Sequence, residues 1–185
     1  MIETRLKPKT CKHCGTTFHP ARMMQSVCGA LCAGRLVKAA KRAETQKTKE
    51  RREKIKTIPK LIREAQTAFN AFIRVRDRSM PCICCGQPLG LDSVGGGFDA
   101  GHYRSTGSAS HLRFDEDNCH GQRKQCNRWG AGRAVDYRIG LIARIGLERV
   151  EALESNNHVH KWTADDLRFI KNEYVSKRKL LEQKE

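Results

Sequence analysis

The sequence is short of aromatic residues and contains no long apolar run. Aromatic side chains make up 6% of the 185 residues, so platforms for stacking unpaired bases are scarce and a single-stranded RNA reader is disfavoured. No apolar run approaches the roughly 20 residues that a helix needs to span a bilayer. The opening MIETRLKPKT is polar and lacks the pattern of a signal peptide. We therefore expect a cytosolic protein with no membrane partner.

Acidic residues are also in the minority. The chain has 36 Lys and Arg against 20 Asp and Glu, a net charge of +16. A positive field of this size attracts polyanions, and nucleic acid is the first candidate partner. A basic surface that only maintains solubility is the alternative, but the magnitude of the charge favours nucleic acid.

Nine cysteines are present, and their spacing favours metal binding over disulfides in a chain without a secretion signal. Close pairs suit zinc, because one short turn directs two sulfurs at an ion and a distant pair completes the tetrahedron. The first group is a C-x2-C pair followed by a C-x3-C pair. It predicts a structural zinc module over residues 1–34 with the ligands Cys11, Cys14, Cys28 and Cys32.

Residues 35–57 are rich in Ala, Lys, Arg, Glu and Gln. From Arg35 to Lys56 the sequence has ten basic and three acidic residues, with too few apolar positions to bury one face of a helix. We expect a basic helical arm that lies along phosphates, or a solvated linker; the two interpretations are compatible.

Residues 58–185 predict a further domain. A helix from Pro59 to before Met80 carries an apolar stripe with helical spacing, formed by Leu61, Ile62, Ala65, Phe69, Phe72 and Ile73. The glycine-rich residues 86–117 predict strand and loop.

Two later segments also predict helices. Helical packing is indicated in the stretch VDYRIGLIARIGLERVEALE by Val135, Ile139, Ile142 and Ile145. A last helix should run from about Ala164 towards Leu181 with its Leu167, Ile170 and Tyr174 turned inward, preceded by a capping box of Thr163 and Asp166.

The central part of this domain carries the elements of a phosphodiester hydrolase. Such an enzyme needs a base that activates water and a divalent cation that stabilises the departing oxygen. The chain offers the order C-x2-C, D-x2-H, N and C-N, with a zinc pair at Cys82 and Cys85. This order resembles the His-Me finger nucleases, the HNH and endonuclease VII group.

A closer resemblance covers the chain from about Ala68 to its C-terminus. The segments AFNAFIRVRDRSMPCICCG, FDAGHYRSTGSASHLRFDEDN, QCN and YRIGLIARIG are similar to the NinG (Rap) family of lambdoid phage recombination proteins, as is the cysteine-rich start with its basic arm. The resemblance implies a mainly helical α+β fold. It would contain a small zinc-clamped ββα-metal core with flanking helices, next to the N-terminal zinc module.

The resemblance also implies roles for individual residues. His102 would be the general base, and Asn127 would be a ligand of a catalytic Mg²⁺ or Mn²⁺ with Asp99 as a second ligand. Asn118 would hold the loop that orients His102. His120 would be a phosphate contact or an extra metal ligand.

Arg123 departs from the family pattern H-x-Q-C-x-x-C-N, in which a cysteine stands at this position. Arginine cannot ligate zinc, because its guanidinium has no free lone pair. Either Cys119 or His120 supplies the fourth ligand, or the site holds zinc through Cys82, Cys85 and Cys126 plus a water, or zinc affinity is lost. We favour Cys119 as the fourth ligand.

The functional hypothesis that follows is a structure-specific endonuclease. It would cut branched recombination intermediates such as D-loops and Holliday junctions in the cytoplasm of the bacterial host. Symmetric cleavage of a four-way junction would suggest a homodimer. The alternative is a non-catalytic, zinc-containing DNA-binding accessory protein, which Arg123 favours.

Overall fold

The computed structural model describes residues 6–90, 97–130 and 132–183. Parts of the predicted segments that fall on residues 1–5, 91–96, 131 and 184–185 lie outside this description. The chain divides into two compact units, Met1–Lys56 and Thr57–Glu185. The described residues form a mainly helical α+β fold with two small antiparallel hairpins. No helix within the described ranges is long and apolar enough to cross a membrane.

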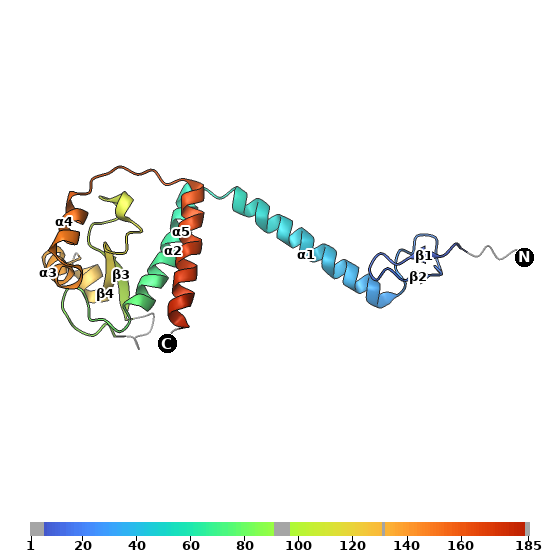
Figure 1. The fold of residues 1–185 in the computed structure, drawn as a ribbon, viewed down its shortest axis with the longest axis horizontal. Helices are drawn as coiled ribbons and strands as arrows, with labels where there is room; N and C mark the ends of the chain where they lie inside the picture. Colours follow the sequence, from blue (N-terminus) through green and yellow to red (C-terminus); the bar gives the residue numbers. More distant parts are fainter. Residues whose placement is uncertain (1–5, 91–96, 131, 184–185) are drawn as a thin grey trace, which may run out of the picture. The chain divides into compact units, whose positions relative to one another are not determined.

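The first unit consists of a small hairpin and one long helix. Strands β1 (Lys9–Thr10) and β2 (Thr17–Phe18) pair antiparallel, and helix α1 follows at Ala30–Lys54 (Figure 1). Gly15 takes a φ of +74° in the turn between the strands, a conformation that favours glycine. None of the residues of α1 is buried, which agrees with its polar composition. Since α1 begins inside the predicted zinc module, the module and the basic arm share one helix.

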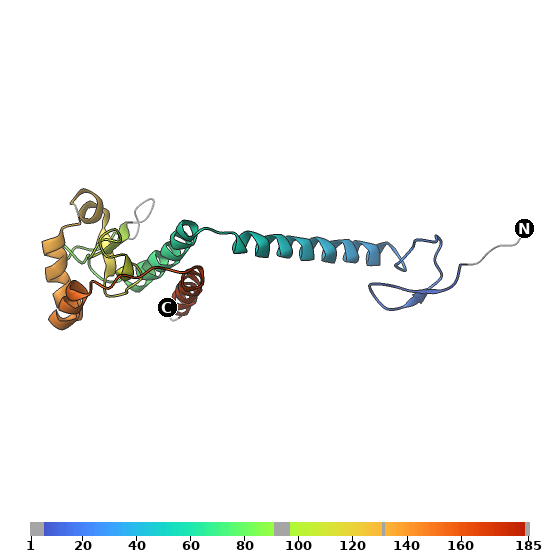
Figure 2. The same ribbon diagram turned by 90° about the horizontal axis from the view of Figure 1, so that it is seen from above.

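Helices α2 (Ile58–Arg76) and α5 (Ala164–Glu182) form the main core of the second unit. They lie side by side and run in the same direction (Figures 1 and 2). Lys171 of α5 forms an ion pair with Glu64 of α2, and further along both helices Lys177 lies over the Phe72 ring. The predicted stripe is confirmed. Its buried members are Leu61, Ala65, Phe69, Phe72 and Ile73, with Ile62 partly buried against them.

The predicted capping box of α5 is also confirmed. Asp166 donates its backbone N–H to the Thr163 hydroxyl at 3.2 Å, and its carboxylate accepts from the Thr163 backbone at 3.0 Å. Leu167 and Tyr174 are buried in the core as expected, and Ile170 is partly buried against it.

A second hairpin lies between two helical layers. Strands β3 (Phe98–His102) and β4 (Cys119–Arg123) pair antiparallel, with Phe98 opposite Arg123 and His102 opposite Cys119. A short 3₁₀ helix, η1 (Ser110–Leu112), lies in the loop between them. One face of the hairpin packs on α2 through Ala100 and Cys119. The other face meets helix α3 (Ala134–Ile145), where the Tyr137 hydroxyl donates to the Gly101 carbonyl at 2.8 Å.

Two α-helices form the segment for which helical packing was predicted. Helix α3 (Ala134–Ile145) and helix α4 (Leu147–Ser155) are separated by Gly146, whose φ is +86°. The predicted inward face was partly wrong: Val135 and Ile139 are 74% and 65% exposed. Tyr137 and Leu141 are the buried residues of α3 instead, because the hairpin and α4 cover that side of the helix.

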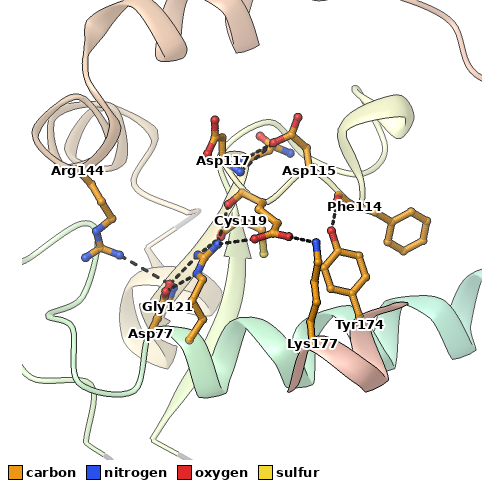
Figure 3. Close-up of polar contacts among 12 residues, drawn as sticks. Asp77, Phe114, Asp115, Asp117, Cys119, Gly121, Arg144, Tyr174 and Lys177 are labelled. Carbon is orange, nitrogen blue, oxygen red and sulfur yellow. Dashed lines mark hydrogen bonds and ion pairs between the residues drawn. The ribbon is translucent and has the colours of Figure 1, made fainter. Parts of the chain in front are cut away.

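A buried ion pair joins α2 to strand β4 (Figure 3). Asp77 accepts the Gly121 backbone N–H at 2.7 Å and the Arg76 guanidinium at 2.7 and 3.0 Å. Arg76 also donates to the carbonyls of Cys119 and Glu116. Burial would raise the pKa of the Asp77 carboxyl, but the hydrogen bonds and charge of Arg76 outweigh it and hold the pKa below its usual value.

The substitution Phe69→Ala should strongly destabilise the second unit. Phe69 is fully buried, with its ring 4.8 Å from that of Tyr174 and 5.9 Å from that of Phe114. Removing a buried phenyl ring costs about 3–5 kcal/mol of unfolding free energy, which urea denaturation would measure. Phe169→Ala, at a 69% exposed position of α5, is the matched control and should change stability by less than about 0.5 kcal/mol. An equal loss in both variants would contradict the assigned core.

Candidate metal and nucleic-acid site

The four N-terminal cysteines form one cluster. The sulfurs of Cys11, Cys14, Cys28 and Cys32 all lie within 4.8 Å of one another, with Cys14–Cys28 at 3.7 Å and Cys28–Cys32 at 3.5 Å. Tetrahedral zinc with Zn–S bonds of about 2.3 Å needs sulfurs roughly 3.8 Å apart. The donor set therefore fits zinc.

The surroundings of these thiols make metal binding sensitive to pH. The backbone N–H of Cys14 is the main group that lowers the pKa of Cys11, to about 6. The hydrogen bond with Cys32 is the main one that raises the pKa of Cys28, to about 12. Four neighbouring thiols cannot all ionise without a cation, so zinc binding releases protons and strengthens as pH rises.

A second cluster contains three cysteines. The sulfurs of Cys82, Cys85 and Cys126 lie within 4.8 Å of one another, and the Cys82 sulfur accepts the Arg123 backbone N–H at 3.3 Å. The hydrogen bond with Cys84 is the main cause that lowers the pKa of Cys82, to about 4. A zinc ion held here would have three protein sulfurs.

The prediction that Cys119 completes this cluster is corrected by the structure. Cys119 stands at the far end of β4, four residues and therefore roughly 13 Å along the strand from Arg123. Its sulfur lies 3.7 Å from His102 Nδ1 instead. His120 is not near the cluster either, because its side chain is buried against Tyr137 with 3% exposure. That burial also removes the predicted phosphate contact of His120. Of the earlier alternatives, zinc held by the three sulfurs of Cys82, Cys85 and Cys126 plus a water agrees best with this geometry.

Asp99 and Asn127 are brought together, although 28 positions separate them. Asn127 Nδ2 donates to Asp99 Oδ2 at 3.1 Å, and Arg128 donates to both carboxylate oxygens at 2.8 and 3.1 Å. Burial would raise the pKa of Asp99, but the hydrogen bonds from Arg128 and Asn127 outweigh it and keep the pKa below its usual value. The carboxylate is therefore ionised at neutral pH. Sequence analysis missed Arg128, whose position beside Asn127 was the available signal.

Asp99 and Asn127 could hold a divalent cation only as a site with few protein ligands. Mg²⁺ keeps several waters and is commonly held by one or two carboxylates together with substrate phosphates. Asp99 and Asn127 would supply the protein oxygens, and an ion bound to Asp99 would compete with Arg128. Within the described ranges, clusters of three or more His, Cys, Asp or Glu are confined to the two cysteine groups.

His102 lies apart from that pair. It stands three positions after Asp99 on β3, so the two side chains leave opposite faces of the strand, roughly 10 Å apart along its length. The His102 Nε2–H donates to the Arg113 carbonyl at 2.9 Å, and the ring lies 6.1 Å from that of Phe69. Burial lowers the pKa of His102, so its ring is neutral at neutral pH.

Asn118 is fully buried and ties together the loop behind His102. Its amide donates to the carbonyls of Arg104 at 3.0 Å and Leu112 at 3.1 Å, and its side-chain oxygen accepts the Arg104 backbone N–H at 2.8 Å. The Tyr103 backbone N–H donates to the Asn118 carbonyl at 2.8 Å. Asn118 therefore restrains the chain directly after His102.

The short helix η2 (Gln125–Trp129) connects the second cysteine cluster to Asp99. It is a π-helix, a form that occurs frequently at functional sites. Cys126 turns towards the cluster, and Asn127 and Arg128 turn towards Asp99.

Zinc content should separate the two clusters. Cys14→Ser and Cys126→Ser should each lose about one zinc per chain, because each removes a thiolate from a different site. Metal analysis of purified protein measures this. Cys119→Ser is the matched control and should retain the zinc of the unaltered chain. Zinc loss in this variant would restore Cys119 as a ligand.

Acid should destabilise the second unit through His120. Burial lowers the pKa of His120 to about 3, whereas in the unfolded chain it titrates near 6.5. The unfolded state therefore binds more protons between these values, and stability falls as pH drops below about 6.5. The loss is about 2 kcal/mol at pH 5.

Urea denaturation at pH 7 and pH 5 tests this expectation. His120→Phe should reduce the pH dependence by that amount, whereas His158→Gln, at an exposed position, should leave it unchanged. An unaltered pH slope in His120→Phe would show that acid acts through other groups, such as the metal thiolates.

Comparisons with known proteins place the chain in a family. The family model described as "Bacteriophage Lambda NinG protein" matches residues 3–185. The chain is 42% identical over 190 residues to Protein ninG of Escherichia phage 933W, and 40% identical over 192 residues to Protein ninG of Escherichia phage lambda. Each match covers 92% of both chains. No solved structure matches. The chain therefore belongs to the NinG family of phage proteins.

Proposed function

We propose that this NinG-family chain is a divalent-metal-dependent endonuclease that hydrolyses phosphodiesters in branched DNA during phage recombination. One observation carries the proposal: Asn127, directly after the cluster cysteine Cys126, contacts the ionised Asp99 at 3.1 Å. Zinc held by the clustered thiols would fix the start of η2, and Asp99 and Asn127 would then supply oxygen ligands beside Arg128.

In this proposal Asp99 and Asn127 hold Mg²⁺ or Mn²⁺. The ion would polarise the scissile phosphate and lower the pKa of a bound water. Arg128, whose side chain is 57% exposed, would exchange its ion pair with Asp99 for the phosphate charge. The carboxylate is ready for this role, because its pKa lies below the usual range.

The His-Me finger assignment belongs to the same proposal. An antiparallel hairpin followed by a helix that carries a ligand supports a ββα-metal core. His102 as the general base stays a prediction. Catalytic contacts can tighten only in the substrate complex, but His102 would have to leave the Arg113 carbonyl and reach the opposite face of β3.

DNA binding would involve the first unit as well. Helix α1 has no buried residue, and it overlaps the segment from Arg35 to Lys56, which contains ten basic and three acidic residues. Exposed lysines and arginines on a helix suit sequence-independent contacts with phosphates. This fits a substrate that is recognised by structure.

A non-catalytic DNA-binding accessory is the second candidate. The observation that favours it is the position of His102, whose Nδ1 faces the buried Cys119 sulfur at 3.7 Å. A histidine held in this way is a packed core residue, and the cysteine clusters and basic surface would then supply the whole function.

Cleavage of a labelled D-loop and a four-way junction, with and without Mg²⁺ or Mn²⁺, tests the proposal. The unaltered chain should nick both in a metal-dependent manner. Asp99→Asn should lower the rate by at least about 100-fold, the scale of removing one electrostatic stabiliser. Arg63→Gln, an exposed position on α2, is the control and should retain activity.

His102→Gln distinguishes two arrangements. Loss of cleavage with unchanged junction binding would mean that His102 reaches the metal in the DNA complex. Retained cleavage would assign it to packing. Tight binding without cleavage by the unaltered chain would reject the nuclease and select the accessory function.

A further inference from the structure

A pocket of about 340 Å³ opens beside the second cysteine cluster. Such a volume is at the small end of ligand pockets, which span about 300–1,000 Å³, and suits one nucleotide better than a duplex. Besides Cys85 and Cys126 of the cluster, its lining combines two arginines, two amides, a tryptophan and a glycine: Arg123, Arg133, Gln87, Gln125, Trp129 and Gly130. We propose that this pocket binds one unpaired nucleotide of a DNA strand at a branch. The proposal rests on the proposed function, because it identifies the part of branched DNA that the protein recognises.

The two guanidinium groups provide the phosphate contact. Arg123 has no hydrogen-bond or ion-pair partner for its side chain anywhere in the described part of the chain, although its backbone N–H is bound to Cys82. Arg133 lies 3.9 Å from the Cys126 sulfur and 3.4 Å from Asp136, so it is held at the pocket wall. Arginine forks suit phosphate geometry, and an unpaired guanidinium gains most from a new anionic partner.

Trp129 provides the surface for the base. It is 79% exposed at the end of η2, although an indole of this size is ordinarily well covered. Every nucleobase has a face that stacks on an aromatic ring, so this contact tolerates any sequence. Gln87 and Gln125 add amide donors and acceptors for the edge of the base.

Close packing at Gly130 shapes the pocket. A Cβ at this position would meet Arg133 Cγ at 2.8 Å and the Cys126 carbonyl at 3.0 Å. Glycine therefore lets Arg133 lie across the end of η2. Three residues of η2 therefore have different contacts. Cys126 belongs to the cysteine cluster, Asn127 contacts Asp99, and Trp129 lines the pocket.

This arrangement also explains Arg123. It occupies the position where the C-x2-C spacing would place a fourth sulfur, and its side chain lines the pocket instead. The second cluster then has three thiolates, and the position has become a phosphate contact next to the proposed cleavage centre.

Equilibrium binding to fluorescent DNA in Ca²⁺ without Mg²⁺ or Mn²⁺ tests the pocket separately from cleavage. The two probes are a four-way junction with unpaired thymines at the branch and the same junction fully paired. Trp129→Ala should weaken binding to the first about tenfold and leave the second nearly unchanged. Arg123→Gln should reduce the salt dependence of log K by about one unit of slope.

Phe169→Ala and Arg63→Gln are the matched controls, since they remove an exposed aromatic ring and an exposed arginine elsewhere in the same unit. They should bind both junctions as the unaltered chain does. Equal weakening of both junctions by Trp129→Ala, or no weakening, overturns the pocket. If the variants bind as expected but the unaltered chain does not cleave DNA, the nucleotide pocket is supported and the nuclease proposal is rejected.

Tryptophan fluorescence gives a direct readout. The chain has two tryptophans, so Trp162→Phe leaves Trp129 as the sole reporter. Oligothymidine should quench this signal, and free thymidine monophosphate should do so only at far higher concentration if the occupant is a DNA strand. If thymidine monophosphate quenched the fluorescence at the same concentration as oligothymidine, the occupant would be a free nucleotide and not a DNA strand, and the proposal would be overturned.

The substitution Arg123→Cys should move two measurements in opposite directions. Zinc should be retained more firmly against a chelator, because a fourth thiolate completes the site. Binding to the junction with unpaired thymines should weaken as in Arg123→Gln. Unchanged junction binding would show that Arg123 does not contact the DNA.

Discussion

The buried contact between Asp77 and the Gly121 backbone sets the position of strand β4, and the candidate site depends on that strand. Asp77 ends α2; the residue is 3% exposed, and its carboxylate binds Gly121 and Arg76. A Cβ at Gly121 would meet Asp77 Cβ at 3.1 Å and Leu89 Cδ1 at 2.8 Å, so any other residue here would force these side chains to shift. Breaking a buried pair by removing one partner typically costs about 3–5 kcal/mol. The α2 core and the hairpin are thus joined through one charged group.

The consequences of that position reach the site through η2. Since β4 ends at Arg123, the next turn begins at a defined place and delivers Cys126 to the thiols and Asn127 to Asp99. A π-helix gives neighbouring residues directions that an α-helix would not. Metal binding by the second cluster would therefore also position the proposed ligand of the catalytic ion. The five residues of η2 therefore contain both a thiol of the cysteine cluster and the proposed ligand of the catalytic ion.

The two faces of the hairpin divide the predicted site. Side chains alternate along a strand, so Asp99 faces η2 while His102 lies against the α2 core beside Phe69. The D-x2-H spacing brings an aspartate and a histidine onto the same strand but onto opposite faces. The same alternation separates Cys119 from His120, and strand length separates both from the cluster thiols.

Local physical chemistry made much of this protein predictable from its sequence. The first cysteine cluster spans only 22 residues, and the stripe of α2 and the capping box at Thr163 depend on helical periodicity and on neighbouring residues. Tertiary structure alone decided the fourth position of the second cluster, the separation of His102 from Asp99, and the exposure of Val135. Those outcomes depend on strand register and on which helix covers which face, and register is set by distant contacts such as that of Asp77 with Gly121.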